Sequence, residues 1–484
     1  MLNDAFTNIS EFAMHYEFAI RIFAWMLFGV GILQNIIYSL QLPAAWLEMR
    51  QHSQAHDTES AWQLLISDAA VPISVIVPAY NEEATIVENV KSMLSLKYPD
   101  MELIIVNDGS KDDTLKCLID AFSLEQVHRA YDLAVPAAPI RGLYGTPAFP
   151  QMLVVDKENG LGKANATNAG INLSRNDLFC VIDADSILER EALLRSVRPF
   201  MENPKEMVAV GGTIRVINGC EIKDGHITNV GLPNRFLPLV QSMEYIRAFL
   251  MSRLAWSYWG SLLIISGAFG IFRRDRTIEV GGFSLDTVGE DYDLVVKLHR
   301  HLSDTNTPYE MRYVPEPVCW TEAPESFAIL GNQRKRWQRG SLEVFLKNKG
   351  MLFNPKYGRI GMLGLPNSLL IDVVGPIVEM LGLILLPIFW ALGVLQLEFM
   401  LAYTALFFVY GVFMSISSLV LEEMELERTP FATDLLKLAL IAILENFGYR
   451  QLNNFWRISG FLDFLRKKND WGVMVRKGFR SGGS

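Results

Sequence analysis

Residues 178–185 read LFCVIDAD, an apolar run that ends in two aspartates separated by one residue. Four similar runs occur at residues 73–78 (ISVIVP), 102–108 (ELIIVND), 151–156 (QMLVVD) and 207–212 (MVAVGG). Short runs rich in β-branched residues predict buried strands, and the helical patterns between them predict βαβ units. We therefore expect an α/β domain with a mostly parallel sheet over residues 71–349.

Three longer apolar segments flank this domain. Phe18–Leu42 carries one charge and has about the ~20 residues that a bilayer crossing needs, so residues 1–45 are expected to be a membrane anchor rather than a cleaved signal peptide. Leu369–Leu395 and Phe399–Leu421 predict a transmembrane hairpin within residues 366–421. Asp372 and Glu379 lie inside the hairpin, and we expect them to face protein or a polar channel.

The remaining segments are harder to place. Residues 46–70 are expected to be a polar linker, and Ala134–Pro150 a loop or insertion. Residues 430–484 hold a short apolar segment, Leu435–Leu444, and a basic tail. We expect the segment to be re-entrant, to lie at the membrane interface or to pair with Phe447–Leu465, rather than to cross alone.

The composition narrows the class of protein. Of 484 residues, 50% are hydrophobic and 20% charged, and the net charge is −9. Soluble domains usually carry more charge, so a purely soluble chain and a disordered chain are both disfavoured. A nucleic-acid binder would show a basic excess, so nucleic acid is not an expected partner. The four cysteines, 117, 180, 220 and 319, form no CxxC pair, so neither a zinc site nor a disulfide framework is expected.

Acidic residues follow several predicted strands. Tyr80 and Glu82 follow the first strand, Asp108 opens a DGS sequence after the second, and Asp183 and Asp185 form the DxD that ends the run 178–185. Ligands of open α/β sheets bind at the carboxyl ends of strands, where a DxD suits a hard cation bridging a diphosphate. Turn formation explains any one cluster, and it is the better explanation for DGS alone. It explains the whole set poorly.

Two glycine-containing segments are further candidates. The sequence GLGKANATNAG at residues 160–170 lets backbone approach a diphosphate beside Lys163, although a helix start with a solvated lysine fits it as well. Gly267 lies in SGAFG at residues 266–270, and Glu290 and Asp291 follow Gly289. The two carboxylates suit a helix N-terminus, and a carboxylate held there also suits a general base.

The last candidate is QRKRWQRG at residues 333–340. One interpretation is a basic amphipathic helix on anionic lipid. The other is an arginine clamp on a diphosphate beside an aromatic platform for a sugar ring. Both hold if Arg334, Lys335 and Arg339 meet lipid while Arg336 and Trp337 face the site.

The order DGS, DxD, ED and QxxRW resembles the processive family-2 glycosyltransferases, which include the synthases of cellulose, hyaluronan, chitin and poly-N-acetylglucosamine. The resemblance covers residues 71–340. It implies the A-type nucleotide-sugar glycosyltransferase fold, flanked by transmembrane helices, and single-displacement transfer with inversion. The implied donor is a UDP-sugar, the acceptor is a glycan, and the cofactor is Mg²⁺ or Mn²⁺.

The resemblance also implies a role for each residue. Asp291 is the catalytic base with Glu290 beside it, and Asp185 holds the metal. Gly289 stands where cellulose-type members often carry threonine, and the segment around Gly267 differs from their acceptor motif, so cellulose is not favoured. The nucleotide-sugar would contact Pro78, Tyr80, Glu82, Asp108, Lys163, Asp183 and Arg336, and the acceptor would contact Gln333, Trp337 and Gly267.

We therefore expect a membrane-bound inverting glycosyltransferase that extends a β-linked polysaccharide. It would be a multi-pass protein of the bacterial cytoplasmic membrane with its catalytic domain in the cytoplasm. Membrane lipid and accessory export or regulatory subunits are the other expected partners. Two alternatives stay open: a non-processive enzyme that glycosylates a lipid, and a catalytically inactive subunit of an export or receptor complex.

Overall fold

The computed structural model describes residues 15–55, 71–160, 162–223, 225–426 and 432–466. The first helix, α2 (Glu17–Ala55), continues well past the apolar segment, so the prediction of a linker from residue 46 is wrong as far as residue 55. Nothing in residues 46–55 stops a helix: the segment holds no proline or glycine, and residues 47–50 are the helix-forming leucine, glutamate, methionine and arginine. The rest of the predicted linker, and the basic tail beyond residue 466, lie outside the described residues.

A ten-stranded mixed sheet forms the centre of the domain, in the order β3-β4-β5-β2-β1-β6-β11-β8-β12-β7. β1 pairs in parallel with both β2 and β6, and β8 pairs in parallel with β12. A separate hairpin joins β9 (Glu221–Lys223) and β10 (His226–Asn229). The ten strands are β1 (Ile73–Ala79), β2 (Met101–Asn107), β3 (Glu125–Gln126), β4 (Ile140–Gly145), β5 (Met152–Lys157), β6 (Leu178–Ile182), β7 (Ile187–Leu188), β8 (Met207–Val216), β11 (Phe269–Arg273) and β12 (Glu310–Thr321).

The five predicted runs are all strands, β1, β2, β5, β6 and β8, and the α/β class with a mostly parallel sheet is confirmed. The expectation of a loop over Ala134–Pro150 is wrong in part, because β4 lies within it and pairs antiparallel to β5. β4 sits near the sheet edge and contains two glycines, so it lacks the β-branched pattern of the inner strands. β11 runs antiparallel between β6 and β8.

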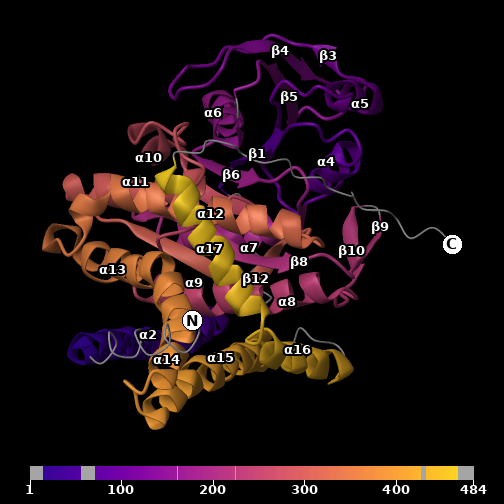
Figure 1. Cartoon of the computed structure of the whole chain (residues 1–484). Helices are drawn as coiled ribbons and strands as arrows, with labels where there is room; N and C mark the ends of the chain where they lie inside the picture. Colours follow the sequence, from indigo (N-terminus) through magenta and orange to yellow (C-terminus); the bar gives the residue numbers. More distant parts are fainter. Residues whose placement is uncertain (1–14, 56–70, 161, 224, 427–431, 467–484) are drawn as a thin grey trace.

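Helices cover both faces of the sheet and create two apolar cores (Figure 1). Ile76 of β1 points to the core shared with α6, and Val77 points to the other core, which holds Ile86 of α4 and Leu118 of α5. This alternation follows from the two-residue repeat of a strand. The helices of the domain are α4 (Ile86–Leu94), α5 (Thr114–Phe122), α6 (Lys163–Leu173), α7 (Ala192–Glu202), α8 (Phe236–Tyr245), η1 (Ile246–Ser252), α9 (Arg253–Tyr258), α10 (Arg274–Glu279), α11 (Glu290–Asp304) and α12 (Phe327–Lys347).

Three helical segments are long and apolar enough to cross a membrane: Glu17–His52, Ile360–Ala391 and Leu397–Met424. They agree with the three predicted segments, and Figure 1 shows their helices at the far end of the molecule from β3 and β4. Short turns η2 (Lys349–Met351) and η3 (Pro355–Tyr357) precede the second of these segments. The C-terminal helices are η4 (Ile360–Gly364), α13 (Leu365–Ser368), η5 (Leu369–Val374), α14 (Gly375–Ala391), α15 (Leu397–Leu426), α16 (Ala432–Leu444) and α17 (Tyr449–Leu465).

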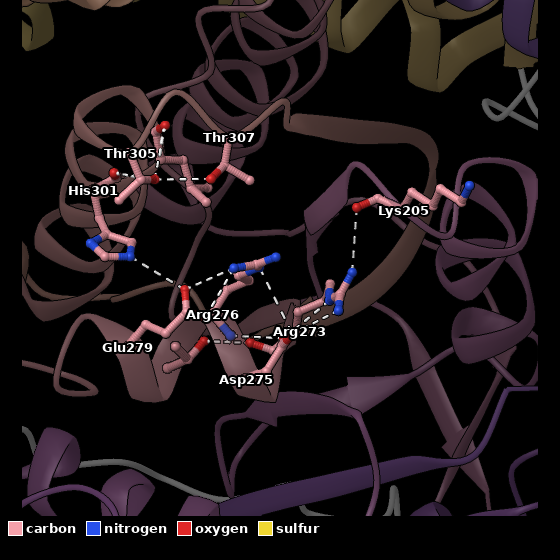
Figure 2. A network of polar contacts seen from close by, with 10 residues as sticks. Lys205, Arg273, Asp275, Arg276, Glu279, His301, Thr305 and Thr307 are labelled. Atoms are coloured by element: carbon pink, nitrogen blue, oxygen red, sulfur yellow. Dashed lines mark hydrogen bonds and ion pairs between the residues drawn. The ribbon is translucent and has the colours of Figure 1, made fainter.

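A polar network ties α10 to the C-terminal end of α11 (Figure 2). Arg276 bonds Glu279 at 2.9 Å, and Glu279 in turn lies 3.3 Å from His301 Nε2. Arg273 bonds Asp275 and reaches the carbonyl of Lys205 at 3.5 Å. Exposed ion pairs of this kind contribute little each, about 0–1 kcal/mol. Together they fasten one end of α11, whose other end carries Glu290 and Asp291.

Candidate active site

One cavity of about 1630 Å³ lies at the carboxyl ends of β1, β2 and β6 and extends towards the membrane helices. Chains that place several polar groups around one such concavity usually use it as a ligand site. Every site residue expected from the sequence lines this cavity: Pro78, Tyr80, Glu82, Asp108, Lys163, Asp183, Asp185, Gly267, Glu290, Asp291, Gln333, Arg336 and Trp337.

Lys163 occupies the middle of this set. It is the first residue of α6, and its Nζ donates to the Asp183 carboxylate and, at 2.6 Å, to the carbonyl of Gly267. Burial acts to lower the pKa of Lys163, but the nearby carboxylates, Asp183 foremost, outweigh it and raise that pKa. The lysine is therefore a fixed positive charge between the DxD and the helix that starts at Glu290.

Asp291 lies in the first turn of α11, where two backbone N–H groups orient its carboxylate. Gly267 donates to Oδ2 at 3.0 Å and Tyr292 donates to Oδ1 at 2.8 Å. Gly267 also leaves the space that the site needs, because a Cβ there would lie 3.1 Å from Lys163 Nζ. The carboxylate is half-buried and aimed at the cavity, which is the placement that a general base requires.

Glu290 lies beside Asp291 at the start of α11. Burial, followed by the adjacent Asp291 charge, raises the pKa of Glu290 to about 7, although Lys163 and Arg336 act in the opposite direction. A carboxyl group with a raised pKa next to a second carboxylate is a common feature of catalytic sites.

The helix α12 presents the QxxRW segment to the cavity, but two of its basic residues, Arg334 and Arg339, are buried in the protein. Arg334 is 5% exposed, donates to Glu244 at 2.6 Å and stacks over Trp337 with 4.4 Å to the ring centroid. Arg339 is also buried and lies 3.7 Å from Glu343. The expectation that Arg334 and Arg339 meet lipid is therefore wrong.

The reason is the C-terminal helix α17, which crosses α12 and packs against it (Figure 1). A Cβ at Gly331 would lie 2.8 Å from the Trp456 indole nitrogen, and one at Gly460 would lie 2.6 Å from the Lys335 carbonyl oxygen. Arg457 of α17 donates to Gln338 at 2.8 Å. This contact could not be predicted from the sequence, because the membrane hairpin separates the two helices along the chain.

A second close contact joins α12 to α11. A Cβ at Gly340 would lie 2.9 Å from the Cα of Gly289, so the two helices touch through backbone atoms. This contact sets the distance between the QxxRW segment and Asp291. It also shows why glycine, rather than the threonine of cellulose-type sequences, suits position 289 in this chain.

Lys157 is a residue that the sequence analysis missed. It is the last residue of β5, it is fully buried, and its Nζ donates to Asp108. A lysine that ends an apolar strand beside an acidic cluster was the available signal, since lysine is almost never fully buried unless it is paired.

Comparisons with known proteins agree with this geometry. A family model described as "Glycosyl transferase family 2" matches residues 74–133, and one described as "Glycosyltransferase like family 2" matches residues 144–340. The two matched segments contain the DGS, DxD, ED and QxxRW sequences. The α/β domain is a family-2 glycosyltransferase domain.

Similar proteins share this glycosyltransferase domain. Poly-beta-1,6-N-acetyl-D-glucosamine synthases of Staphylococcus epidermidis and Staphylococcus aureus are 31% and 29% identical over 276 residues, which is 57% of this chain and 56% of each relative. The chain thus spans about half the length of these relatives.

Among solved structures, a mannosyltransferase from Pyrobaculum calidifontis, in complex with GDP-Man and Mn²⁺, is 17% identical with a TM-score of 0.49, covering 92% of this chain and 100% of that chain. TarS of S. aureus in complex with UDP-GlcNAc is 14% identical with a TM-score of 0.38, covering 80% of this chain and 92% of that chain.

The carboxylate oxygens that the glycosyltransferase domain offers at the cavity suit a hard divalent cation. The described residues contain no group of three or more histidine, cysteine or acidic side chains close enough to enclose a metal. Asp185 is buried against the cavity and offers carboxylate oxygens, which Mg²⁺ and Mn²⁺ prefer. Mg²⁺ is typically bound by one or two carboxylates together with substrate phosphates, so this sparse set matches such a site.

Two carboxylates extend the cavity wall among the membrane helices. Glu379 accepts from Arg450 and Asn454, each at 2.7 Å. Asp372 accepts from Ser368 at 3.0 Å and lies 3.5 Å from Arg457. The expectation that Asp372 and Glu379 face protein or a polar channel is confirmed, since both also line the cavity.

Proposed function

We propose that the chain is a membrane-bound inverting glycosyltransferase that transfers a sugar from a UDP-sugar to a growing β-linked polysaccharide. The observation that carries this proposal is one continuous cavity. It joins the nucleotide end of the sheet, the carboxylate of Asp291 and the QxxRW helix to a polar wall between helices that are long enough to cross a membrane. A long hydrophilic acceptor needs such a continuous polar path.

The nucleotide would lie over the ends of β1, β2 and β6, in the position that open α/β sheets use for their ligands. Asp108 and the segment Pro78–Glu83 would contact the uridine, and Asp183 the ribose. Mg²⁺ or Mn²⁺ on Asp185 would offset the negative charge of the diphosphate. Arg336 would provide a second positive charge, because guanidinium groups match phosphate oxygens well.

The chemical step needs one base. The acceptor hydroxyl gives its proton to Asp291 while its oxygen forms a bond to the anomeric carbon. The bond from that carbon to the UDP oxygen breaks on the opposite face, so the configuration inverts. Arg336 stabilises the charge that develops on the leaving group. Trp337 and Gln333 would hold the acceptor, since an indole face suits a sugar ring.

The donor sugar follows from the relatives. Their names specify N-acetyl-D-glucosamine, so UDP-N-acetylglucosamine is the first donor to test. The catalytic domain would face the bacterial cytoplasm, where UDP-sugars are made, with membrane lipid around the spanning helices. Accessory export or regulatory subunits are further partners that this arrangement allows.

The test is a transfer assay on the purified full chain in detergent or in proteoliposomes, with UDP-N-acetylglucosamine and Mg²⁺ or Mn²⁺. UDP release together with a ladder of long products on a gel is the expected result. A single sugar on an extracted lipid would instead establish lipid glycosylation. If no UDP is released from any UDP-sugar tested, the chain is not the enzyme that we propose.

A further inference from the structure

One glutamate of α12 binds the turn that leads into α11. Glu343 Oε2 accepts from the hydroxyl of Thr287 at 2.8 Å and from the backbone N–H of Val288 at 3.1 Å. The Thr287 hydroxyl in turn accepts from the N–H of Gly289, the N-cap residue of α11, at 3.1 Å. A chain of hydrogen bonds therefore runs from α12 to the residue that precedes Glu290.

The two ends of this turn, residues 282–289, are fixed by different helices. At its start, Ser284 donates to the buried carboxylate of Asp293, and Lys297 donates to the carbonyl of Gly282 at 2.6 Å. Asp293 and Lys297 both belong to α11, so α11 holds the start of its own preceding turn. At its end, the hydrogen bonds to Glu343 join the turn to α12 instead.

Glu343 shares a face of α12 with the residues that approach the site. Residues 336, 340 and 343 are separated by four and three positions, so their side chains lie in one row along the helix. Arg336 lines the cavity, and Gly340 touches the backbone of Gly289. The glycine contact sets how close the two helices come, but such a contact can slide. Two hydrogen bonds to one carboxylate oxygen also fix the position along the helix axis.

The two oxygens of Glu343 have different partners. Oε2 receives the turn, whereas Oε1 lies 3.7 Å from Nε of the buried Arg339. Glutamine at this position would keep a carbonyl oxygen in the place of Oε2 and lose the charge that faces Arg339. The hydrogen bonds to the turn can therefore be separated from the ion pair by experiment.

We propose that Glu343 is a positioning residue that fixes Asp291 relative to Arg336 and Trp337. It keeps the base aimed at the acceptor hydroxyl while the guanidinium group meets the diphosphate. Glu343 itself does not line the cavity, so it acts through the turn that it binds. The inference rests on the proposed role of Asp291 as the base, and it adds a residue outside the cavity on which the alignment of the site depends.

The experiment measures kcat for UDP release and the dissociation constant of UDP for the purified full chain with Mg²⁺. Glu343→Ala removes both hydrogen bonds to the turn. We expect kcat to fall about 10- to 100-fold, because a displacement of about 1 Å can reduce a rate that much. The dissociation constant of UDP should stay within about threefold of the wild type, since α12 remains packed against α17 and keeps Arg336 in place.

Glu343→Gln distinguishes this role from a purely structural one. Its amide oxygen still accepts from Thr287 and Val288, so kcat should stay within about threefold of the wild type. If the ion pair with Arg339 were what matters, Glu343→Gln would lose as much activity as Glu343→Ala, and that result would overturn the inference. Asp286→Ala is the matched control. It removes an exposed ion pair between the same turn and α12, at 3.3 Å from Lys347, and should leave kcat unchanged.

If Glu343→Ala does not fold, Thr287→Val replaces it, because valine keeps the shape of the side chain and removes the hydroxyl between Gly289 and Glu343. Here kcat should fall about three- to tenfold, which is the effect of one hydrogen bond, with UDP affinity unchanged. Wild-type kcat in Glu343→Ala, or in Thr287→Val where it stands in, would overturn the inference. A wild-type chain that releases no UDP from any UDP-sugar would instead contradict the proposed function, and the inference with it.

Discussion

The contact between Gly340 and Gly289 provides a quantitative test of how α12 is held against the catalytic helix α11. In Gly340→Ala, the added Cβ would lie 2.9 Å from the Cα and 3.0 Å from the backbone nitrogen of Gly289. Carbon atoms pack best at about 3.5–4.0 Å, so α12 must move away by roughly 0.6–1 Å. Nothing flexible lies between the two backbones to absorb this change.

Two effects on stability then compete. Alanine is favoured over glycine inside a helix by about 1 kcal/mol, whereas forcing an extra methyl group into a packed contact costs about 1–3 kcal/mol. We therefore expect a net loss of about 0–2 kcal/mol in the free energy of unfolding. The effect on catalysis should be larger, because Arg336 and Trp337 lie one turn before Gly340 and move with it. A displacement of about 1 Å can reduce the rate about 100-fold.

The assay is the rate of UDP release, with kcat and KM for the UDP-sugar measured separately and the melting temperature recorded for the same samples. Gly350→Ala is the control, because a Cβ there would meet nothing within 4 Å. We expect kcat to fall about 10- to 100-fold in Gly340→Ala and to stay unchanged in Gly350→Ala. Wild-type kcat with a raised melting temperature in Gly340→Ala would show that the helix contact does not control the site.

Three further predictions concern the electrostatics and the acceptor platform. Asp185→Ala should lose the part of UDP binding that depends on Mg²⁺ or Mn²⁺, and a metal dependence equal to that of the wild type would show that Asp185 is not the metal ligand. Arg336→Ala should weaken UDP binding, whereas Trp337→Ala should slow transfer with little change in UDP affinity; equal losses of affinity would contradict this division of roles. Because the pKa of Glu290 is raised to about 7, the folded state takes up its proton more readily than the unfolded chain. Stability from this group is therefore full below about pH 4.5 and is lost as the pH rises through 7, so Glu290→Gln should flatten the fall in melting temperature between about pH 5 and 7, and parallel curves for the two proteins would refute the assignment.

The sequence predicts the inner strands of the sheet well, because each inner strand carries its own signal in a short apolar run. Strands such as Leu178–Ile182 are continuous apolar runs because helices cover both faces of the sheet. Ile140–Gly145, which lies next to the edge strand β3, carries no such run and was missed. The three candidate membrane-spanning segments were predicted because the length and the hydropathy of a segment are enough to identify it. The prediction for Leu435–Leu444 remains a prediction, although α16 at 13 residues is shorter than a bilayer crossing needs.

For the site, the polar residues at strand ends were predictable because their types are unusual after apolar runs. Their partners were not, since they come from distant parts of the chain. Glu244 accepts a hydrogen bond from Arg334, and Arg457 donates one to Gln338. Neither Glu244 nor Arg457 belongs to a sequence motif near α12. Lys157 lies one residue beyond the predicted strand 151–156 and was passed over, because a lysine at a strand end usually reaches solvent.

The most direct test of the central claim, that Asp291 is the base of a glycosyl transfer, is to measure turnover and UDP affinity together in Asp291→Asn. The asparagine keeps the shape of the side chain and can keep one of its two backbone contacts, because its amide nitrogen cannot accept the other N–H, and it cannot take up the proton. Turnover should fall by at least about 100-fold while the dissociation constant of UDP stays within about threefold of the wild type. Asp286→Asn, at an exposed site before the same helix, should leave both values unchanged. Near wild-type turnover in Asp291→Asn would remove Asp291 from the mechanism.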